Sequence, residues 1–275
     1  DGVNENILAT LRISWQKRKV LLHVDRNGYV YVLDRKTGEV LSATPFVRVT
    51  SSKGVDLKTG RLIYNQDKYP RLGKVVRDIA PASPGAKDWQ PAAFSLRTEW
   101  LYIPHQTMAM DYEGTASRYV AGIPYTGTVA KFSAESTESG DDSRGALTAW
   151  DPVKKQQVWR IKEKLPVLSG AMVTAGDVVF YGTLEGKFKA VHARTGEVLW
   201  QHATGAGIIG QPITYQGSDG KQYVAILAGL GHAAESVITA NLAARDATAA
   251  DGLLDPMKDL PQATAKGALY VFTLP

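Results

Sequence analysis

The side chains that most often carry out chemistry in proteins are sparse and scattered in this sequence. Cysteine is absent from the 275 residues, which excludes disulfides, thiolate metal sites and cysteine nucleophiles within the chain. The five histidines share no metal-ligand spacing and are expected in strands or loops; they are His23, His105, His192, His202 and His232. No Ser-His-Asp set, phosphate-binding loop or dinucleotide fingerprint stands out. Short catalytic motifs therefore assign no reaction to this chain.

Composition narrows the class of protein further. Hydrophobic residues make up 44% of the chain, which is ordinary for a globular protein and sufficient for a core. The formal charge of +5 is spread along the sequence without a basic, aromatic-rich face, so nucleic-acid binding is not expected. A mild positive field could still steer an acidic protein partner. No stretch approaches the roughly 18 to 20 apolar residues that a membrane span needs.

The elements that must position any site are predicted by a repeated phrase. It reads GYVYVLDRKTGEVL at 28–41, GALTAWDPVKKQQVW at 145–159 and GKFKAVHARTGEVLW at 186–200, with a truncated copy, GALYVFTLP, at 267–275. Each full copy is an alternating apolar strand, a tight polar turn and a second strand that ends in an apolar residue. Period-two alternation interrupted by such a turn predicts a β-hairpin.

The spacing of the copies indicates how the hairpins assemble. The second and third copies begin 41 residues apart, and the wider gaps of 117 and 81 residues leave room for insertions. All-strand units with a period of about 40 to 50 residues are typical of propeller blades, which bury their faces by stacking. We expect Trp159 and Trp200 to fill the gaps between blades. The sequence therefore predicts an all-β propeller of about four blades, with a β-sandwich as the alternative.

Four further segments complete this outline. Further hairpins are expected within 171–183 and 211–228, and irregular surface excursions are expected at 131–144 and 233–263. An open arc of about four blades would expose two unpaired faces. We therefore expect either an amino-terminal partner segment that completes the ring or a second copy of the arc, as in a homodimer.

Longer phrases resemble one family. They are DGVNE at 1–5, HVDRNGYVYVLDRKTGEVLSA at 23–43, KDWQPAAFS at 87–95, MDYEG at 110–114, AGDVVFYGTLEGKFKAVHARTGEVLW at 175–200, GIIGQPITY at 207–215 and GKQYVAIL at 220–227. In order and spacing they resemble the large subunit of pyrroloquinoline-quinone (PQQ) dependent methanol dehydrogenases and related quinoprotein alcohol dehydrogenases. They correspond to the second half of that family's eight-bladed propeller, so residues 1–275 are expected to form a partial propeller domain.

The resemblance implies a periplasmic oxidoreductase that oxidises a small primary alcohol, such as methanol, by hydride transfer to metal-bound PQQ. In the family the metal polarises the quinone, a carboxylate takes the alcohol proton, and a cytochrome c reoxidises the cofactor. The family's catalytic aspartate falls two residues before the DGVNE phrase. The isolated chain is therefore expected to show no turnover.

Two charged residues match the family's site. Arg26 matches the arginine that contacts the quinone oxygens and the catalytic carboxylate, and a guanidinium suits this role because it donates in a planar fork. The alternative is a solvated residue of an Asn-Gly hairpin turn. Asp1 matches the additional aspartate of the lanthanide-dependent branch, where the calcium-dependent branch usually has alanine. A trivalent ion gains from another hard oxygen ligand, although Asp1 could also be a solvated terminal carboxylate.

Several positions depart from the family pattern. Gln106 replaces a quinone-binding asparagine with a longer amide, Leu168 replaces a pocket tryptophan, and His232 with Ala233 stand where another tryptophan is usual. These changes leave open a remodelled pocket or a non-catalytic propeller that serves as a binding or scaffold protein.

Four positions in matching phrases receive less specific expectations. Ala80 and Ala109 replace the family's paired cysteines, a loss that concerns stability more than chemistry. Asp88 lies in a matching phrase near the pocket without an assigned role, and Trp89 beside it is expected in the core.

Overall fold

The structure, a computed structural model, describes residues 4–116, 118, 121, 127–134, 142–230, 257, 259–264 and 267–273. Within these ranges the regular secondary structure is almost entirely antiparallel β-strand, accompanied by the short 3-10 helix η1 (Gln66–Lys68). No helix among the described residues is long and apolar enough to cross a membrane. The predicted all-β class is confirmed.

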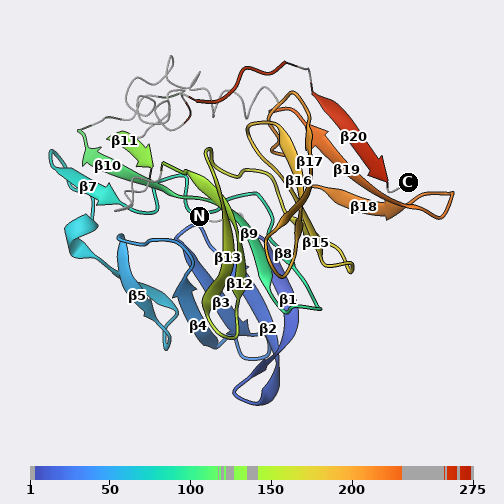
Figure 1. The fold of residues 1–275 in the computed structure, drawn as a ribbon. Helices are drawn as coiled ribbons and strands as arrows, with labels where there is room; N and C mark the ends of the chain where they lie inside the picture. The colour runs from blue at the N-terminus through green and yellow to red at the C-terminus, as the bar shows by residue number, and fades with distance from the viewer. Residues whose placement is uncertain are drawn as a thin grey trace.

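Four sheets follow one another along the chain, and in each of them neighbouring strands are antiparallel (Figure 1). The first holds β1 (Asn6–Ile13), β2 (Gln16–Val24), β3 (Tyr29–Asp34) and β4 (Val40–Pro45). The second holds β8 (Ala93–Phe94), β9 (Leu101–Gln106), β12 (Gly145–Asp151) and β13 (Gln156–Glu163). The third holds β14 (Met172–Val173), β15 (Val178–Gly182), β16 (Lys187–His192) and β17 (Val198–Ala203). The fourth holds β18 (Ile213–Gln216), β19 (Gln222–Ala228) and β20 (Ala268–Thr273).

Two smaller sheets are inserted between these units. They contain β5 (Ser52–Asp56) with β6 (Arg61–Tyr64), and β7 (Val75–Ile79) with β10 (Met108–Gly114) and β11 (Thr128–Ala134). The expectation of an irregular excursion over 131–144 is wrong for its first four residues, because they pair with β10 as the end of β11. The register that pairs Ile79 with Met110 brings Ala80 and Ala109 to neighbouring buried positions.

Each full copy of the repeated phrase forms the third and fourth strands of its sheet, so the predicted hairpins are confirmed. The register of each hairpin shifts at the same place, where the third strand approaches its turn: Val32/Leu33, Ala149/Trp150 and Ala190/Val191. Each turn then uses one left-handed residue: Gly38, Lys155 and Gly196, with φ of 78°, 60° and 74°. The repeat is therefore a repeat of backbone conformation as well as of sequence.

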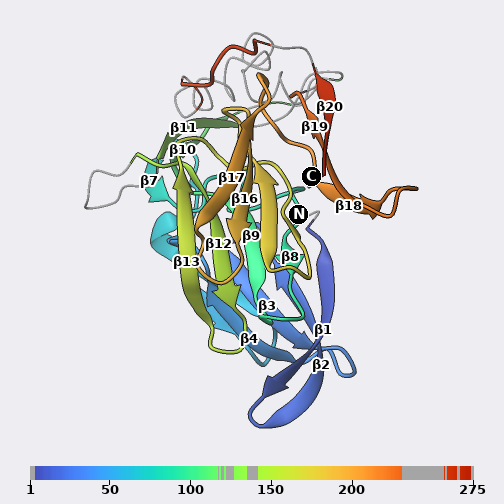
Figure 2. The same ribbon diagram turned by 45° about the vertical axis from the view of Figure 1, so that its right-hand side comes forward.

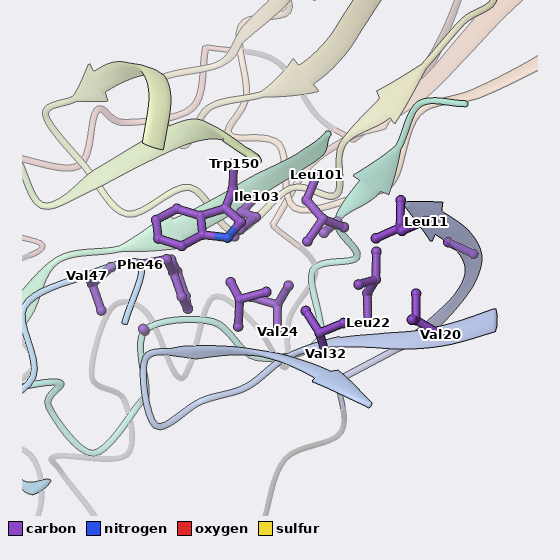
Figure 3. Packing of buried hydrophobic residues seen from close by; sticks show 14 residues of the cluster. Leu11, Val20, Leu22, Val24, Val32, Phe46, Val47, Leu101, Ile103 and Trp150 are labelled. Carbon is purple, nitrogen blue, oxygen red and sulfur yellow. The ribbon is translucent and has the colours of Figure 1, made fainter. Parts of the chain in front are cut away.

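The sheets stack face to face, because successive side chains of a strand point to opposite faces. In β9, Leu101 and Ile103 pack against the first sheet, whereas Tyr102 packs against the third. Figure 3 shows the first of these interfaces, in which Leu101 and Ile103 lie opposite Leu22 and Val32. A strand enclosed on both sides is buried throughout, as β9 is. The central sheets thus form continuous layers of core.

Large aromatic residues fill the outer gaps between sheets, as predicted. The Trp159 indole nitrogen donates to the carbonyl of Ala193 in the next sheet at 2.9 Å. A Cβ placed on Gly196 would lie 2.9 Å from the Trp159 ring, so glycine lets the ring sit directly on the neighbouring turn. The ring centroid of Trp200 lies 4.9 Å from that of Phe272 on β20.

Candidate functional site

Arg26 lies in the turn between β2 and β3, and the local sequence fixes the backbone of this turn. The Gly28 amide donates to the Asp25 carbonyl at 3.1 Å, and the Asn27 side-chain oxygen accepts from the Tyr29 amide at 3.1 Å. Gly28 has a φ of +90°, which glycine adopts without a Cβ penalty. The ordinary Asn-Gly turn chemistry is therefore present, and it directs the Arg26 side chain towards a neighbouring loop.

The loop formed by residues 83–90 holds the Arg26 guanidinium. Nη1 donates to Asp88 Oδ2 at 3.1 Å, and Nη2 donates to the Ser83 carbonyl at 2.8 Å. Gly85 lies under the side chain, since a Cβ at this glycine would be 2.9 Å from Arg26 Cβ. The side chains of Arg26 and Asp88 are 30% and 15% exposed, so the pair is shielded yet reachable from solvent. Arg26 is more than a freely solvated turn residue.

A buried ion pair fastens the same loop to the start of β1. The Lys87 side chain has no exposed surface, and its Nζ lies 2.6 Å from Glu5 Oε2. The other Glu5 oxygen accepts from the Ala92 amide at 2.8 Å. Burial lowers the pKa of the Lys87 amino group, and the Glu5 carboxylate opposes that shift. Glu5 thus ties the start of β1 to the loop that carries Asp88.

Two side chains near this ion pair have buried polar atoms without a partner. They are both amide atoms of Asn4 and the Oδ1 atom of Asp88. Buried polar groups in proteins are nearly always hydrogen-bonded, so a group that brings its own donors and acceptors fits here. Together with the Arg26 fork, these atoms supply amide, guanidinium and carboxylate contacts. Such a set suits one edge of an oxygen-rich planar cofactor such as PQQ.

Gln106 also belongs to this region, at the end of β9. Its side-chain nitrogen donates to the carbonyls of Pro84 and Gly85 at 3.1 and 2.8 Å, and its backbone amide donates to Ala86. The amide side chain therefore braces the loop beneath Arg26. Its binding to a quinone stays a prediction.

Leu168 lies on an adjoining loop, residues 165–171. This loop is joined to the 83–90 loop and its continuation, because Gln90 Nε2 donates to the Val167 carbonyl at 3.4 Å and the Ala171 amide donates to Pro91 at 2.9 Å. The Leu168 side chain is 4% exposed and belongs to an apolar cluster. The other members are Leu165 and Leu184, with Ile209, Leu230, Met257 and Leu260 packed against them. Leucine at this position is thus packed among apolar side chains.

The other residues that the sequence suggested are either outside the described part of the chain or placed differently from the prediction. Asp1, His232 and Ala233 lie outside the described residues. Within the part of the chain that the structure describes, no group of three His, Cys, Asp or Glu side chains could hold a metal ion. Trp89 is 45% exposed, so its predicted place in the core is wrong; the loop buries Lys87 and Gln90 instead.

Sequence reasoning left Asp88 without a role and did not consider Asn4, Glu5 or Lys87. The available signal was a pair of opposite charges in two of the matching phrases: Glu5 near the start of the chain and Lys87 in the Lys-Asp phrase at 87–88. Charge alone could not show that Lys87 would turn inward to Glu5 while Asp88 would turn to Arg26.

Comparisons with known proteins identify the family to which this fold belongs. Residues 51–224 match the family described as PQQ, glucose/ethanol/alcohol dehydrogenase, β-propeller domain. The chain is 45% identical over its full length to a lanthanide-dependent methanol dehydrogenase of Methylacidiphilum fumariolicum strain SolV, of which it covers 45%. A quinoprotein ethanol dehydrogenase of Pseudomonas aeruginosa is 38% identical over 84% of the chain and 38% of the relative.

A solved structure extends the likeness to three dimensions. A europium-containing methanol dehydrogenase superposes with a TM-score of 0.89 at 43% identity, covering 100% of this chain and 48% of that one. The chain therefore spans about half the length, or less, of the relatives that it matches. From the matched residues and the fold, this chain belongs to the PQQ family of glucose/ethanol/alcohol dehydrogenase β-propeller domains.

Proposed function

We propose that residues 1–275 are the carboxyl-terminal half of a PQQ-dependent dehydrogenase propeller, and that the whole protein oxidises a small primary alcohol such as methanol. The observation that carries this proposal is the Arg26–Asp88 pair beside unpartnered buried polar atoms, in a chain of this family. Bound PQQ would supply the two-electron acceptor for the hydride of the alcohol, and the alcohol proton would pass to a carboxylate base in the other half of the protein.

Each residue of the site has a distinct task in this proposal. Arg26 directs its remaining N–H donors at the oxygens of the cofactor, and its positive charge favours the negative charge that develops on them during reduction. Asp88 and the Ser83 carbonyl hold the guanidinium in one orientation, so little reorganisation is needed. Gln106 fixes the backbone beneath Arg26. The packed cluster around Leu168 excludes water from one side of the site.

Asp1 contributes a carboxylate ligand to the metal ion in this proposal. A lanthanide is favoured over calcium because a trivalent ion binds an additional anionic oxygen strongly. The Methylacidiphilum fumariolicum relative and the superposed structure are named as a lanthanide-dependent and a europium-containing methanol dehydrogenase.

The rest of the ring comes from an amino-terminal half of the propeller or from a second copy of this chain in a homodimer. The open side of the fourth sheet supports this, because Leu227, Leu269 and Val271 are 59%, 66% and 45% exposed on β19 and β20. A contiguous apolar face of this kind is stable when a further sheet covers it. We place the complete enzyme in the periplasm, with a cytochrome c as electron acceptor.

The test uses the full-length protein, loaded with PQQ and a lanthanide. Arg26→Lys keeps the charge and loses the fork, so we expect PQQ to bind at least tenfold more weakly and methanol oxidation with an artificial electron acceptor to fall further. Arg77→Lys is the matched control, because that arginine is 76% exposed and pairs with Asp111 elsewhere. A full-length protein that bound neither PQQ nor metal would contradict the proposal, and so would turnover by the isolated chain.

A second function, a non-catalytic propeller that binds partners, is favoured by one observation. The Gln106 amide nitrogen is already occupied by two loop carbonyls. Absence of a red-shifted quinone absorbance in the full-length protein, after PQQ and a lanthanide are added, would support this alternative.

A further inference from the structure

The hairpin of β1 and β2 ends in an unusual turn. Ser14 and Trp15 connect the strands with φ of 48° and 67°, so both residues are left-handed. Two-residue hairpin turns of this geometry normally use Asn-Gly, because a Cβ is unfavourable at φ above zero. Trp15 is nevertheless 90% exposed, and the hairpin projects from the lower end of the molecule in Figure 2. The Trp15 indole is therefore exposed to solvent in a turn whose left-handed backbone is strained.

The strand ends next to this turn carry basic side chains that repel one another. Arg12 and Lys17 are paired directly across the two strands, and Lys19 lies one alternate position further on the same face. Like charges that face each other across strands destabilise a hairpin. All three side chains are exposed, and no described acidic side chain forms an ion pair with them. Arg12 and Lys17 lie beyond Val20–Asp34, the last pair between β2 and β3, so they extend past the part of the first sheet that a neighbouring sheet would cover. Strain and repulsion that persist in one exposed element point to a binding role.

A second apolar side chain projects from the same end of the molecule. Leu96, in the turn between β8 and β9, is 85% exposed; it and Trp15 are the most exposed large hydrophobic residues of the described chain. The β9–β12 pairing sets Leu101 opposite Trp150, so the turn with Leu96 lies at the same end as the β12–β13 turn. Residues of that β12–β13 turn line a small pocket together with Ser14.

We propose that this end of the molecule docks on an anionic phospholipid surface. Trp15 and Leu96 enter the headgroup region, and Arg12, Lys17 and Lys19 face the lipid phosphates. Indole rings favour the membrane–water interface, and each nearby basic residue adds to the attraction of an anionic surface.

The shape and the charge of the β1–β2 tip, residues 12–19, favour a lipid surface over a protein as the binding partner. A lone indole on a convex tip suits a soft interface, whereas protein hot spots are usually buried in a fitted pocket. A two-fold contact between copies would bring the same cations together. Arg26 follows the other end of β2, a nine-residue strand roughly 30 Å long, so docking leaves the candidate site free.

The experiment measures co-sedimentation of the full-length protein with phosphatidylcholine vesicles that do or do not contain phosphatidylglycerol. Wild-type protein is expected to bind the anionic vesicles and to be released by high salt. Trp15→Gly is expected to weaken binding about tenfold while raising the melting temperature, because glycine relieves the turn. Loss of binding therefore cannot be attributed to unfolding.

Charge and control variants complete the design. Replacing Arg12, Lys17 and Lys19 by Gln together is expected to weaken binding roughly a hundredfold, at about fivefold per charge. The charge control replaces three exposed lysines elsewhere by Gln: Lys53, Lys74 and Lys221. Leu72→Ser is the apolar control, since Leu72 is 72% exposed outside the tip.

Three results overturn the proposal. They are no vesicle binding by the wild type, equal loss in the control variants, and a change of oligomeric state in Trp15→Gly without any change in vesicle binding. The last result would assign the tip to a contact between copies.

Discussion

Lys87 Nζ lies 2.6 Å from Glu5 Oε2, and this contact joins the beginning of β1 to the loop that orients Arg26. Lys87→Met leaves a partly buried carboxylate without its counter-ion, and breaking such a pair costs about 3 kcal/mol. We expect that loss in the free energy of unfolding, measured by urea denaturation of the full-length protein, together with weaker PQQ binding.

The exposed Lys53→Met is the control and is expected to change stability by less than about 0.5 kcal/mol. Joint replacement, Glu5→Leu with Lys87→Met, is expected to recover part of the stability, because no uncompensated charge then remains. If the double variant were as unstable as the sum of both single variants, the two side chains would not be coupled.

Gly85→Ala tests the contact beneath Arg26. Alanine at a φ of +83° is strained, and its Cβ would lie 2.9 Å from Arg26 Cβ. We expect a stability loss of about 1 to 2 kcal/mol and a marked loss of PQQ affinity in a spectroscopic titration. Gly38→Ala has a similar φ of +78° and open space around it, so it should lose stability alone. Equal loss of PQQ affinity in both variants would show that Gly85 has no special relation to Arg26.

Lys155 occupies a left-handed turn position where the other two repeats have glycine. Lys155→Gly is therefore expected to raise the free energy of unfolding by about 1 kcal/mol, because the Cβ penalty disappears. Lys154→Gly, one residue earlier and outside the left-handed region, should lower stability instead through the added freedom of the unfolded chain. Thermal denaturation of the two variants gives opposite shifts if the backbone conformation is the cause.

His105 provides a prediction about pH. The imidazole is fully buried, its Nε2 lies 2.9 Å from Thr148 Oγ1, and burial holds its pKa well below the usual value of 6.5. At a pH below 6.5 the imidazole binds a proton in the unfolded chain but stays neutral in the folded chain. The free energy of unfolding therefore falls as the pH decreases.

His105→Gln removes this contribution. Between about pH 7.5 and about pH 5.5 the wild type should lose about 1.4 kcal/mol more stability than this variant. The same substitution at His192, the last residue of β16 in the third sheet, should leave the wild-type difference in place because His105 still carries it. An identical pH dependence in wild type and His105→Gln would exclude His105 as the source.

The sequence by itself determined the elements whose signals are local. Alternating apolar residues and Asp/Gly turns specify a hairpin within about 15 residues, and the recurrence of that hairpin specifies similar sheets that stack. The roles of Trp159 and Trp200 followed from their place at the hairpin ends. The Asn-Gly turn around Arg26 could also be predicted from the local sequence, because its hydrogen bonds join residues at most four positions apart.

Only the tertiary structure decided which side chains meet. Arg26 and Asp88 are 62 residues apart, and Lys87 and Glu5 are 82 apart, so no periodicity links them. The irregular loop at 83–90 has no alternation from which burial can be inferred, and for this reason Trp89 was wrongly expected in the core while Lys87 was overlooked. Burial in such a loop depends on which neighbour offers a counter-charge, and that is fixed only when the sheets have stacked.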